Sequence, residues 1–173
     1  RVFGPNGDFE KDIEPEYITV SDDSKTAYIT LQENNAIAKL NIATKTIESI
    51  LPLGYMDYSK PGFEADFSDR DNQIAFNSWP VFGLYLPDAI ASMQYEGTTY
   101  LFTANEGDAR EYTAFTEAKR VKDLRLDATA FPNGTALKTD AQLGRLNVTS
   151  TLGDTDFDGD YDALYAFNSR SFS

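Results

Sequence analysis

Residues 14–53 read EPEYITVSDDSKTAYITLQENNAIAKLNIATKTIESILPL, and this stretch decides the fold class. Runs rich in β-branched and aromatic residues alternate with short polar turns, a pattern typical of antiparallel strands joined by hairpins. We expect strands over 14–20, 26–31, 36–42 and 46–53. Four short antiparallel strands within about 40 residues are typical of one blade of a β-propeller.

A similar pattern returns at Leu86. The run 86–92, with Pro87 in second place, matches 14–20, with Pro15 in second place, and both copies end in a polar Asn/Glu turn. We therefore predict an all-β protein, a fragment of a β-propeller with about two blades plus the first strand of a third. The expected organisation is a blade over 10–53, an insertion over 54–85, a blade over 86–110, an insertion over 111–153, and a calcium-type loop with the next strand over 154–173.

The two insertions are long for simple blade turns, and long excursions from a regular scaffold are usually functional or partner-facing. In the later one we expect one or two short helices, over 113–121 with Thr113 as the cap and near 140–144. Residues 161–167 are expected to form the opening strand of the third blade. The aromatic run 79–85, which begins with Trp79, either packs in a core or stacks against a sugar or a partner.

The charge balance restricts the partners. The chain has 28 acidic and 15 basic residues and a net charge of −13, so it repels nucleic acid and anionic lipid. An excess of carboxylates suits a compartment where calcium neutralises them, as outside the cell. The sequence begins at Arg1 without an initiator Met, and we expect a segment of a larger secreted, periplasmic or cell-surface protein whose signal peptide lies outside it.

Two residue types are missing altogether. The chain has no cysteine and no histidine, which excludes disulfides, thiolate zinc sites, imidazole ligands and His-based triads within it. No apolar run is long enough for a membrane-spanning helix, so we expect no direct membrane insertion.

The sharpest motif is DTDFDGDYD at 154–162. Carboxylates at positions one, three and five, Gly159 at position six and a carboxylate at position nine reproduce the front of a calcium loop, although Tyr165 replaces the glutamate at position twelve. Five carboxylates this close repel one another without a counter-ion. We expect calcium as the cofactor, and the alternative is a solvated acidic turn. The expected ligands are Asp154, Asp156, Asp158, Asp160 and Asp162.

A second acidic cluster is more ambiguous. If the two segments that carry it belong to one decorated blade, its groups converge at one rim as a second hard-cation centre or as paired carboxylates for acid–base chemistry. Alternatively, Arg70 and Arg110 pair with neighbouring carboxylates and pin the loops. The members that we consider as metal ligands are Asp69, Asp71, Asp88, Glu106 and Asp108.

Several strings together resemble a known family. They are EPEYI at 14–18, LQENNA at 31–36, SDRD at 68–71, LPDAIA at 86–91, TANEGDAR at 103–110 and LYAFNSRSFS at 164–173. In this order they resemble the choice-of-anchor I family of bacterial surface proteins, many of them labelled alkaline phosphatase-like. The family is similar to mesenchyme-specific cell surface glycoproteins linked to biomineralisation. The resemblance implies a secreted, surface-associated propeller with a phytase-like or surface-layer character.

Two functions remain open at this point. The first is an extracellular calcium-binding propeller segment with a structural, adhesion or mineral-associated role, whose partners are calcium and surface-layer or matrix components. The alternative is a metal-dependent phosphoesterase acting on a phosphate ester, in which the second cluster holds the metal and Arg70 or Arg110 clamps the phosphate. No nucleophile–base constellation favours catalysis, and a scaffold without any metal is a third possibility.

Overall fold

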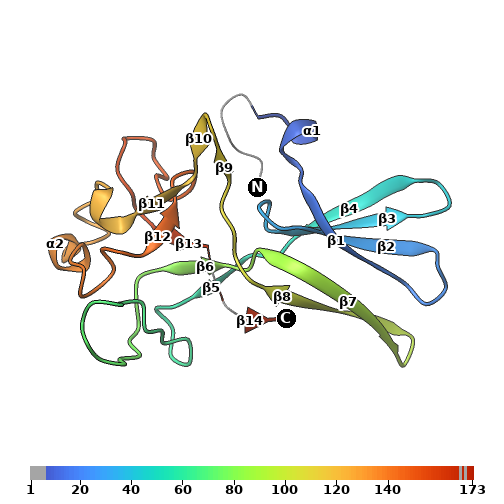
Figure 1. Cartoon of the computed structure of the whole chain (residues 1–173), viewed down its shortest axis with the longest axis horizontal. Coiled ribbons are helices and arrows are strands. Elements are labelled where there is room, and N and C mark those ends of the chain that lie inside the picture. Colours follow the sequence, from blue (N-terminus) through green and yellow to red (C-terminus); the bar gives the residue numbers. More distant parts are fainter. Residues whose placement is uncertain (1–6, 168, 170) are drawn as a thin grey trace. The chain divides into compact units, whose positions relative to one another are not determined.

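The four strands predicted over 14–53 form one sheet. The computed structural model describes residues 7–167, 169 and 171–173. Each strand pairs antiparallel with the next along the chain (Figure 1). Each turn contains one residue in the left-handed region, namely Ser24, Asn35 and Lys45, as tight hairpin turns require. The strands are β1 (Pro15–Val20), β2 (Thr26–Leu31), β3 (Ala36–Asn41) and β4 (Thr46–Pro52).

The chain divides into two compact units. The first contains residues 7–55, 84–108, 169 and 171–173, and the second contains 56–83 and 109–167. In the first unit the short helix α1 (Phe9–Asp12) precedes β1, and the Asp8 side chain caps it by accepting from Lys11 N. Its core lies at β2 and β3, where Leu31, Ala36 and Ala38 are buried.

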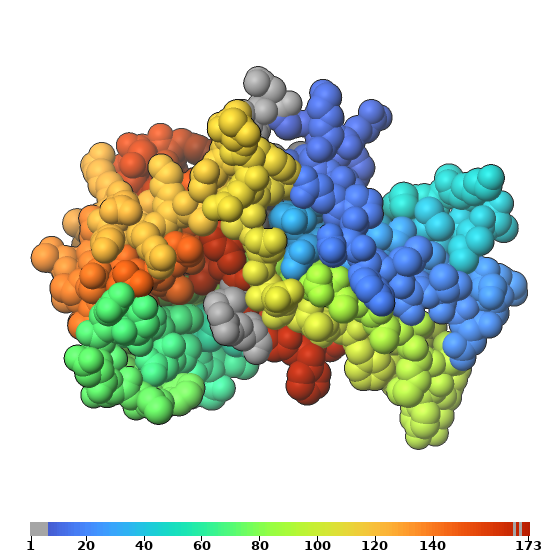
Figure 2. Space-filling model, in the orientation of Figure 1, coloured from blue at the N-terminus to red at the C-terminus, as the bar shows by residue number. Residues whose placement is uncertain are grey.

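A long hairpin completes the first unit. β7 (Pro87–Tyr95) and β8 (Thr98–Asn105) pair antiparallel, and β14 (Ser171–Phe172) adds to the other side of β8. The Thr30 hydroxyl donates to the Asp88 carbonyl at 3.1 Å, which holds β7 beside β2. The tip of the hairpin projects from this unit (Figure 2).

The predicted similarity between residues 14–20 and 86–92 is visible in the structure at the first residues of β1 and β7. Pro15 and Pro87 each open a strand, and in each strand the register shifts directly afterwards. Proline cannot donate to a neighbouring strand, so this placement at a strand end is favourable. Beyond the first two strands the two sheets differ. In the first sheet the next strand along the chain, β3, pairs with β2, whereas the strand that pairs with the far side of β8 is β14, at residues 171–172.

The second unit is built mainly from the two segments predicted as insertions, together with the predicted calcium-type loop and the strand after it. Its five-stranded sheet has the order β11-β12-β13-β6-β5, in which β13 pairs parallel with β6. The strands, in chain order, are β5 (Tyr55–Asp57), β6 (Phe82–Leu84), β11 (Ala118–Arg120), β12 (Asn147–Thr149) and β13 (Tyr165–Ala166). A 3-10 turn, η1 (Val121–Asp123), and the short helix α2 (Gly134–Leu137) pack with them. The buried core contains Tyr58, Val81, Val121, Leu124, Phe131, Leu137, Leu143, Val148, Leu164 and Ala166.

The prediction of an all-β protein with few, short helices is confirmed, but the two helices predicted in the later insertion are not at the expected positions. Residues 113–121 form no helix: β9 (Glu111–Tyr112) and β10 (Phe115–Thr116) make a small hairpin, and β11 follows. Tertiary contacts of this segment explain the difference. Glu117 is fully buried, and its carboxylate accepts from the Thr149 hydroxyl at 2.5 Å and from Arg110 N at 3.2 Å. These contacts hold the segment extended against β12 and override its helix propensity.

The helix predicted near 140–144 is also wrong. The chain there turns back on itself, with Leu143 N donating to the Leu137 carbonyl at 3.0 Å and Gly144 N to the Thr139 carbonyl at 2.9 Å. A Cβ at Gly144 would lie 2.3 Å from the Lys138 carbonyl oxygen, so only glycine permits this approach. The strand predicted over 161–167 is shorter than expected, because only 165–166 pair as a strand.

Candidate metal centre

The acidic motif lies in the second unit, in the loop between β12 and β13. Tyr161 anchors it: its N–H donates to the Arg125 carbonyl at 3.0 Å, and its carbonyl accepts from Asp127 N at 3.0 Å. The Tyr161 hydroxyl also donates to the Ser150 carbonyl at 3.2 Å. The C-terminal part of the motif is therefore fixed on a neighbouring chain segment and on the start of its own loop.

Gly153 closes the two ends of the loop. Its carbonyl accepts from Asp162 N at 2.7 Å and from Ala163 N at 3.1 Å. Its φ is 109°, in the region that favours glycine, and a Cβ at this position would lie 2.2 Å from the Ala163 carbonyl oxygen. The closure brings the first and last carboxylates of the motif to the same side.

Three of the predicted ligands come together as a result. Asp154, Asp156 and Asp162 each place one carboxylate oxygen within 4.8 Å of the others. Calcium binds oxygen at 2.3–2.6 Å, so two oxygens on one ion are at most about 5 Å apart. The three carboxylates therefore have a spacing that one calcium ion can span.

Asp154 contains the most informative atom of the group. Its Oδ2 accepts from Gly159 N at 3.1 Å. Its Oδ1 is buried and has no hydrogen-bond partner within the described part of the chain. A carboxylate oxygen withdrawn from water without a partner is costly, and a bound cation would remove that cost.

A second carboxylate group shares Asp162. Asp127, Asp160 and Asp162 also place one oxygen each within 4.8 Å of the others. Asp160 is only 6% exposed and pairs with the Arg125 guanidinium at 3.2 Å. Asp127 was not among the ligands predicted from the sequence, because only the pairing of Leu126 with Tyr161 brings it to the motif. No local spacing signals that contact.

The environment shifts the pKa values of two of these carboxyl groups in opposite directions. Burial and the nearby Asp158 carboxylate raise the pKa of Asp160 above its ordinary value. Hydrogen bonds from the Thr155 hydroxyl at 2.6 Å and from its backbone N–H at 2.8 Å lower the pKa of Asp162. Asp158 lies in neither group, and its Oδ1 accepts from Asp160 N at 3.0 Å.

The second predicted cluster is divided between the two units. Asp69 and Asp71 belong to the second unit, whereas Asp88, Glu106 and Asp108 belong to the first. The convergence of all five therefore stays a prediction. Asp69 has a clear partner in Arg145, whose Nε and Nη2 donate to the two carboxylate oxygens at 2.7 and 3.1 Å. Arg70, which the sequence suggested for this role, also pairs with Asp69, with its Nε 3.9 Å from Oδ1.

The Asp69–Arg145 pair gives a pH-dependent prediction. The hydrogen bonds from Arg145 lower the pKa of Asp69, so the pair stabilises the fold above the ordinary Asp pKa and stops doing so as pH falls through the folded-state value. Asp69→Asn should lower the urea midpoint slightly at neutral pH, because exposed pairs contribute little, and the difference from wild type should shrink below pH ~4. Asp22→Asn, at an exposed site, is the control. A difference that grows on acidification would contradict this account.

No helix in the described ranges is long and apolar enough to cross a membrane.

Comparison with known proteins gives one family. The choice-of-anchor I domain matches residues 1–173, the whole chain. No curated protein and no solved structure matches the chain. A choice-of-anchor domain implies a surface-associated or secreted protein. The resemblance found in the six sequence strings is thus confirmed, and the chain belongs to the choice-of-anchor I family.

Proposed function

We propose that the chain is a calcium-binding segment of a surface-associated or secreted protein, with a structural, adhesion or mineral-associated role. The observation that supports this most directly is the buried, unpartnered Asp154 Oδ1 beside two further carboxylates. Such an arrangement is unfavourable when empty, because like charges repel and one oxygen is desolvated. A hard divalent cation with oxygen ligands relieves both costs.

The wider charge distribution agrees with this role. A net charge of −13 makes the surface repel anions and attract cations. Calcium in the 154–162 loop would also connect that loop with the segment around Asp127, since both carboxylate groups share Asp162. We propose that the ion fixes this loop and so makes the second unit more rigid for display at a surface.

We also propose that the first sheet is one blade of a propeller. Its four strands form an antiparallel meander in chain order, as a blade does. Its outer strands expose large apolar side chains, among them Ile18 at 53% and Tyr17 at 54% on β1 and Ile47 at 50% on β4. Exposed apolar positions of this kind suit contacts with neighbouring blades in a longer protein.

The phosphoesterase alternative has weaker support. It needs an arginine that is free to clamp phosphate beside a metal-bound water. Arg110, one of the two arginines suggested by the sequence, is only 3% exposed and therefore badly placed for a substrate, and the other, Arg70, is exposed but pairs with Asp69 at 3.9 Å. Hydrolysis of a generic phosphomonoester in the presence of calcium distinguishes the alternatives, since a structural calcium site gives no turnover.

A thermal melt with calcium or with chelator tests the calcium proposal. A ligand that binds only the folded state at 100 times its Kd stabilises that state by about 2.7 kcal/mol, so calcium should raise Tm by several degrees. Asp154→Asn should remove this rise. In chelator the variant should melt no lower than wild type, because it replaces an unpartnered anionic oxygen with an amide that can donate to Asp156 or Asp162.

The matched control is Asp158→Asn, which keeps an acceptor for Asp160 N and lies outside both carboxylate groups. It should retain the calcium-dependent rise. A wild-type protein that melts at the same temperature in calcium and in chelator would contradict the proposal. Equal loss of the rise in both variants would contradict the choice of ligands.

A further inference from the structure

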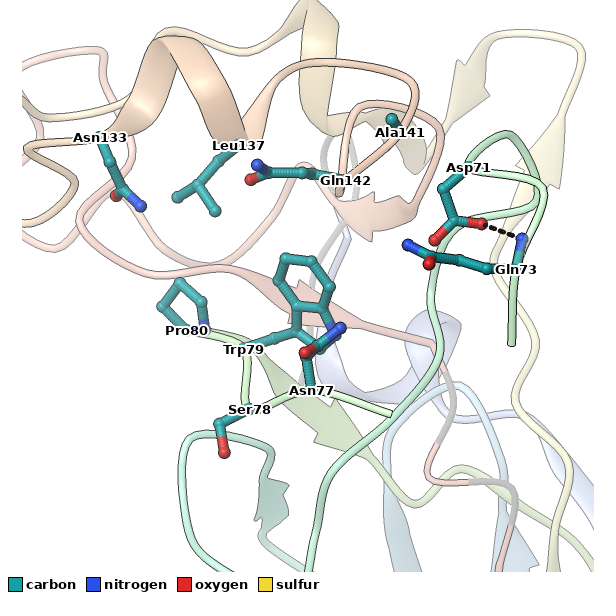
Figure 3. A pocket seen from close by; sticks show the side chains of 10 residues that line it. All are labelled: Asp71, Gln73, Asn77, Ser78, Trp79, Pro80, Asn133, Leu137, Ala141 and Gln142. Carbon is teal, nitrogen blue, oxygen red and sulfur yellow. Dashed lines mark hydrogen bonds between the residues drawn. The ribbon is translucent and has the colours of Figure 1, made fainter. Parts of the chain in front are cut away.

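A pocket in the second unit, separate from the acidic loop, has the chemistry of a ligand site. Its cavity of about 440 Å³ lies between residues 71–80 and 133–142 (Figure 3). Small-molecule sites usually have volumes of ~300–1,000 Å³. Both walls belong to the same compact unit, so the pocket is formed within one body. The side chains that define its chemistry are Asp71, Gln73, Asn77, Trp79, Asn133 and Gln142.

Amide side chains dominate these walls. Each of Gln73, Asn77, Asn133 and Gln142 has two N–H donors and a carbonyl acceptor. A ligand that satisfies several amides must both donate and accept at many points, as vicinal hydroxyl groups do. Among the described residues that line the cavity there is no lysine or arginine, and Asp71 adds negative charge. An anionic ligand such as phosphate or a uronic acid would therefore meet repulsion without a counter-charge.

Trp79 provides the apolar surface that such a site needs. Its indole ring lies between the two walls and points toward Gln142 and Leu137 (Figure 3). The indole Nε1–H donates to the Ala65 carbonyl at 2.8 Å, so the ring and not the N–H is available to a ligand. Phe67 packs against it with ring centroids 6.5 Å apart and fixes its position. An aromatic ring beside convergent hydrogen-bonding groups matches a pyranose, which has an apolar C–H face and a rim of hydroxyls.

The two walls are fastened to each other before any ligand binds. The bidentate Asp69–Arg145 pair joins the loop that precedes Asp71 to the segment that follows Gln142. The Ser68 hydroxyl donates to the Asp140 carbonyl at 3.1 Å, which adds a second tie. Asp71 accepts from Gln73 N at 3.2 Å, so the carboxylate is itself oriented (Figure 3). A preformed site avoids much of the ordering cost of binding.

We propose that this pocket binds a neutral sugar residue of an oligosaccharide or polysaccharide. The sugar places its C–H face against Trp79, and its hydroxyls hydrogen-bond to the amides and to Asp71. The proposal does not rest on calcium in the acidic loop, since no residue of 154–162 lines the pocket. Sugar binding and calcium binding can therefore fail independently.

Intrinsic fluorescence gives a direct test, because Trp79 is the single tryptophan of the chain. The wild-type chain is titrated with neutral oligosaccharides of glucose, mannose, galactose and N-acetylglucosamine, and separately with oligogalacturonate and inorganic phosphate. We expect a saturable change in Trp79 emission with at least one neutral series, in calcium and in chelator alike. No saturable change with any neutral series, or equally strong binding of the acidic probes, would overturn the proposal.

Variants assign the binding to the pocket. Gln142→Ala and Asn133→Ala should each weaken the affinity measured by calorimetry about three- to tenfold, the usual effect of one lost hydrogen bond. Asn147→Ala, an exposed amide of the same unit outside the pocket, is the matched control and should bind like wild type. Trp79→Ala should abolish binding, and its fold is checked by circular dichroism. Unchanged affinity in both pocket-amide variants would place the sugar elsewhere and contradict the inference.

Discussion

Gly153→Ala is expected to destabilise the second unit by about 3–5 kcal/mol and to remove its response to calcium. Gly153 has a φ of 109°, which a residue with a Cβ adopts at a cost of about 1–3 kcal/mol. The added methyl group would also lie 2.2 Å from the Ala163 carbonyl oxygen, a backbone atom that cannot rotate away. The backbone at Ala163, just before β13, must move to relieve this contact.

That movement would separate the carboxylates. The Gly153 carbonyl accepts from Asp162 N and Ala163 N, so displacement of the chain there breaks both closing hydrogen bonds. Asp162 then moves away from Asp154, and the three-carboxylate group loses a member. Under our proposal the calcium-dependent rise in Tm disappears with it.

Gly159→Ala is the matched control for this experiment. Gly159 has a similar φ of 90°, but a Cβ there would meet nothing within 4 Å. The control therefore has the backbone strain without the collision, and it should lose only about 1–3 kcal/mol. Urea unfolding followed through Trp79 emission measures both variants in chelator. Equal midpoints for the two variants would show that the contact with Ala163 does not hold the loop closed.

The sequence predicted the first sheet correctly because its determinants are local. Apolar runs and polar turns alternate along 14–53, and the left-handed conformations fall at Ser24, Asn35 and Lys45, within or next to those turns. Each strand pairs with its neighbour along the chain, so no distant contact has to be guessed. Local pattern and topology agree over this stretch.

The second unit was harder to predict because its strands pair over long distances. β6 pairs with β13, some 80 residues away in the sequence, and neither strand is long enough to give a periodic pattern. The same cause made the helix prediction over 113–121 wrong. Its propensity favoured a helix, but the buried hydrogen bonds of Glu117 to Thr149 and Arg110 held the segment extended.

The candidate metal site also contains residues that local sequence predicts and residues that only distant contacts bring in. The spacing of the motif brought Asp154, Asp156 and Asp162 to attention, and the fold places them together. The motif could not indicate Asp127, which depends on the anchoring of Tyr161, or the exclusion of Asp158 from both groups. The pocket around Trp79 depends on loops that meet only in the folded unit. A linear sequence shows the aromatic residue there but not the amides that face it.

Leu143→Ala is expected to cost about 2–5 kcal/mol of unfolding free energy in the second unit. Leu143 is fully buried in the core that includes Leu137 and Leu164. Its backbone holds the turn that follows α2, since its N–H donates to the Leu137 carbonyl and its carbonyl accepts from Leu146 N at 2.8 Å. Truncation leaves a cavity beside this turn, and the backbone hydrogen bonds that hold the turn oppose its collapse into the space.

The control is Ile74→Ala, which removes a similar aliphatic group from a side chain that is 87% exposed in the same unit. It should change stability by no more than ~0.5 kcal/mol. The measurement is the urea midpoint from Trp79 emission, which reports on the second unit because Trp79 packs against its core. A Leu143→Ala midpoint equal to that of Ile74→Ala would mean that the turn relaxes into the space. The pocket wall formed by 133–142 would then be adaptable, and the preformed sugar site would lose its structural basis.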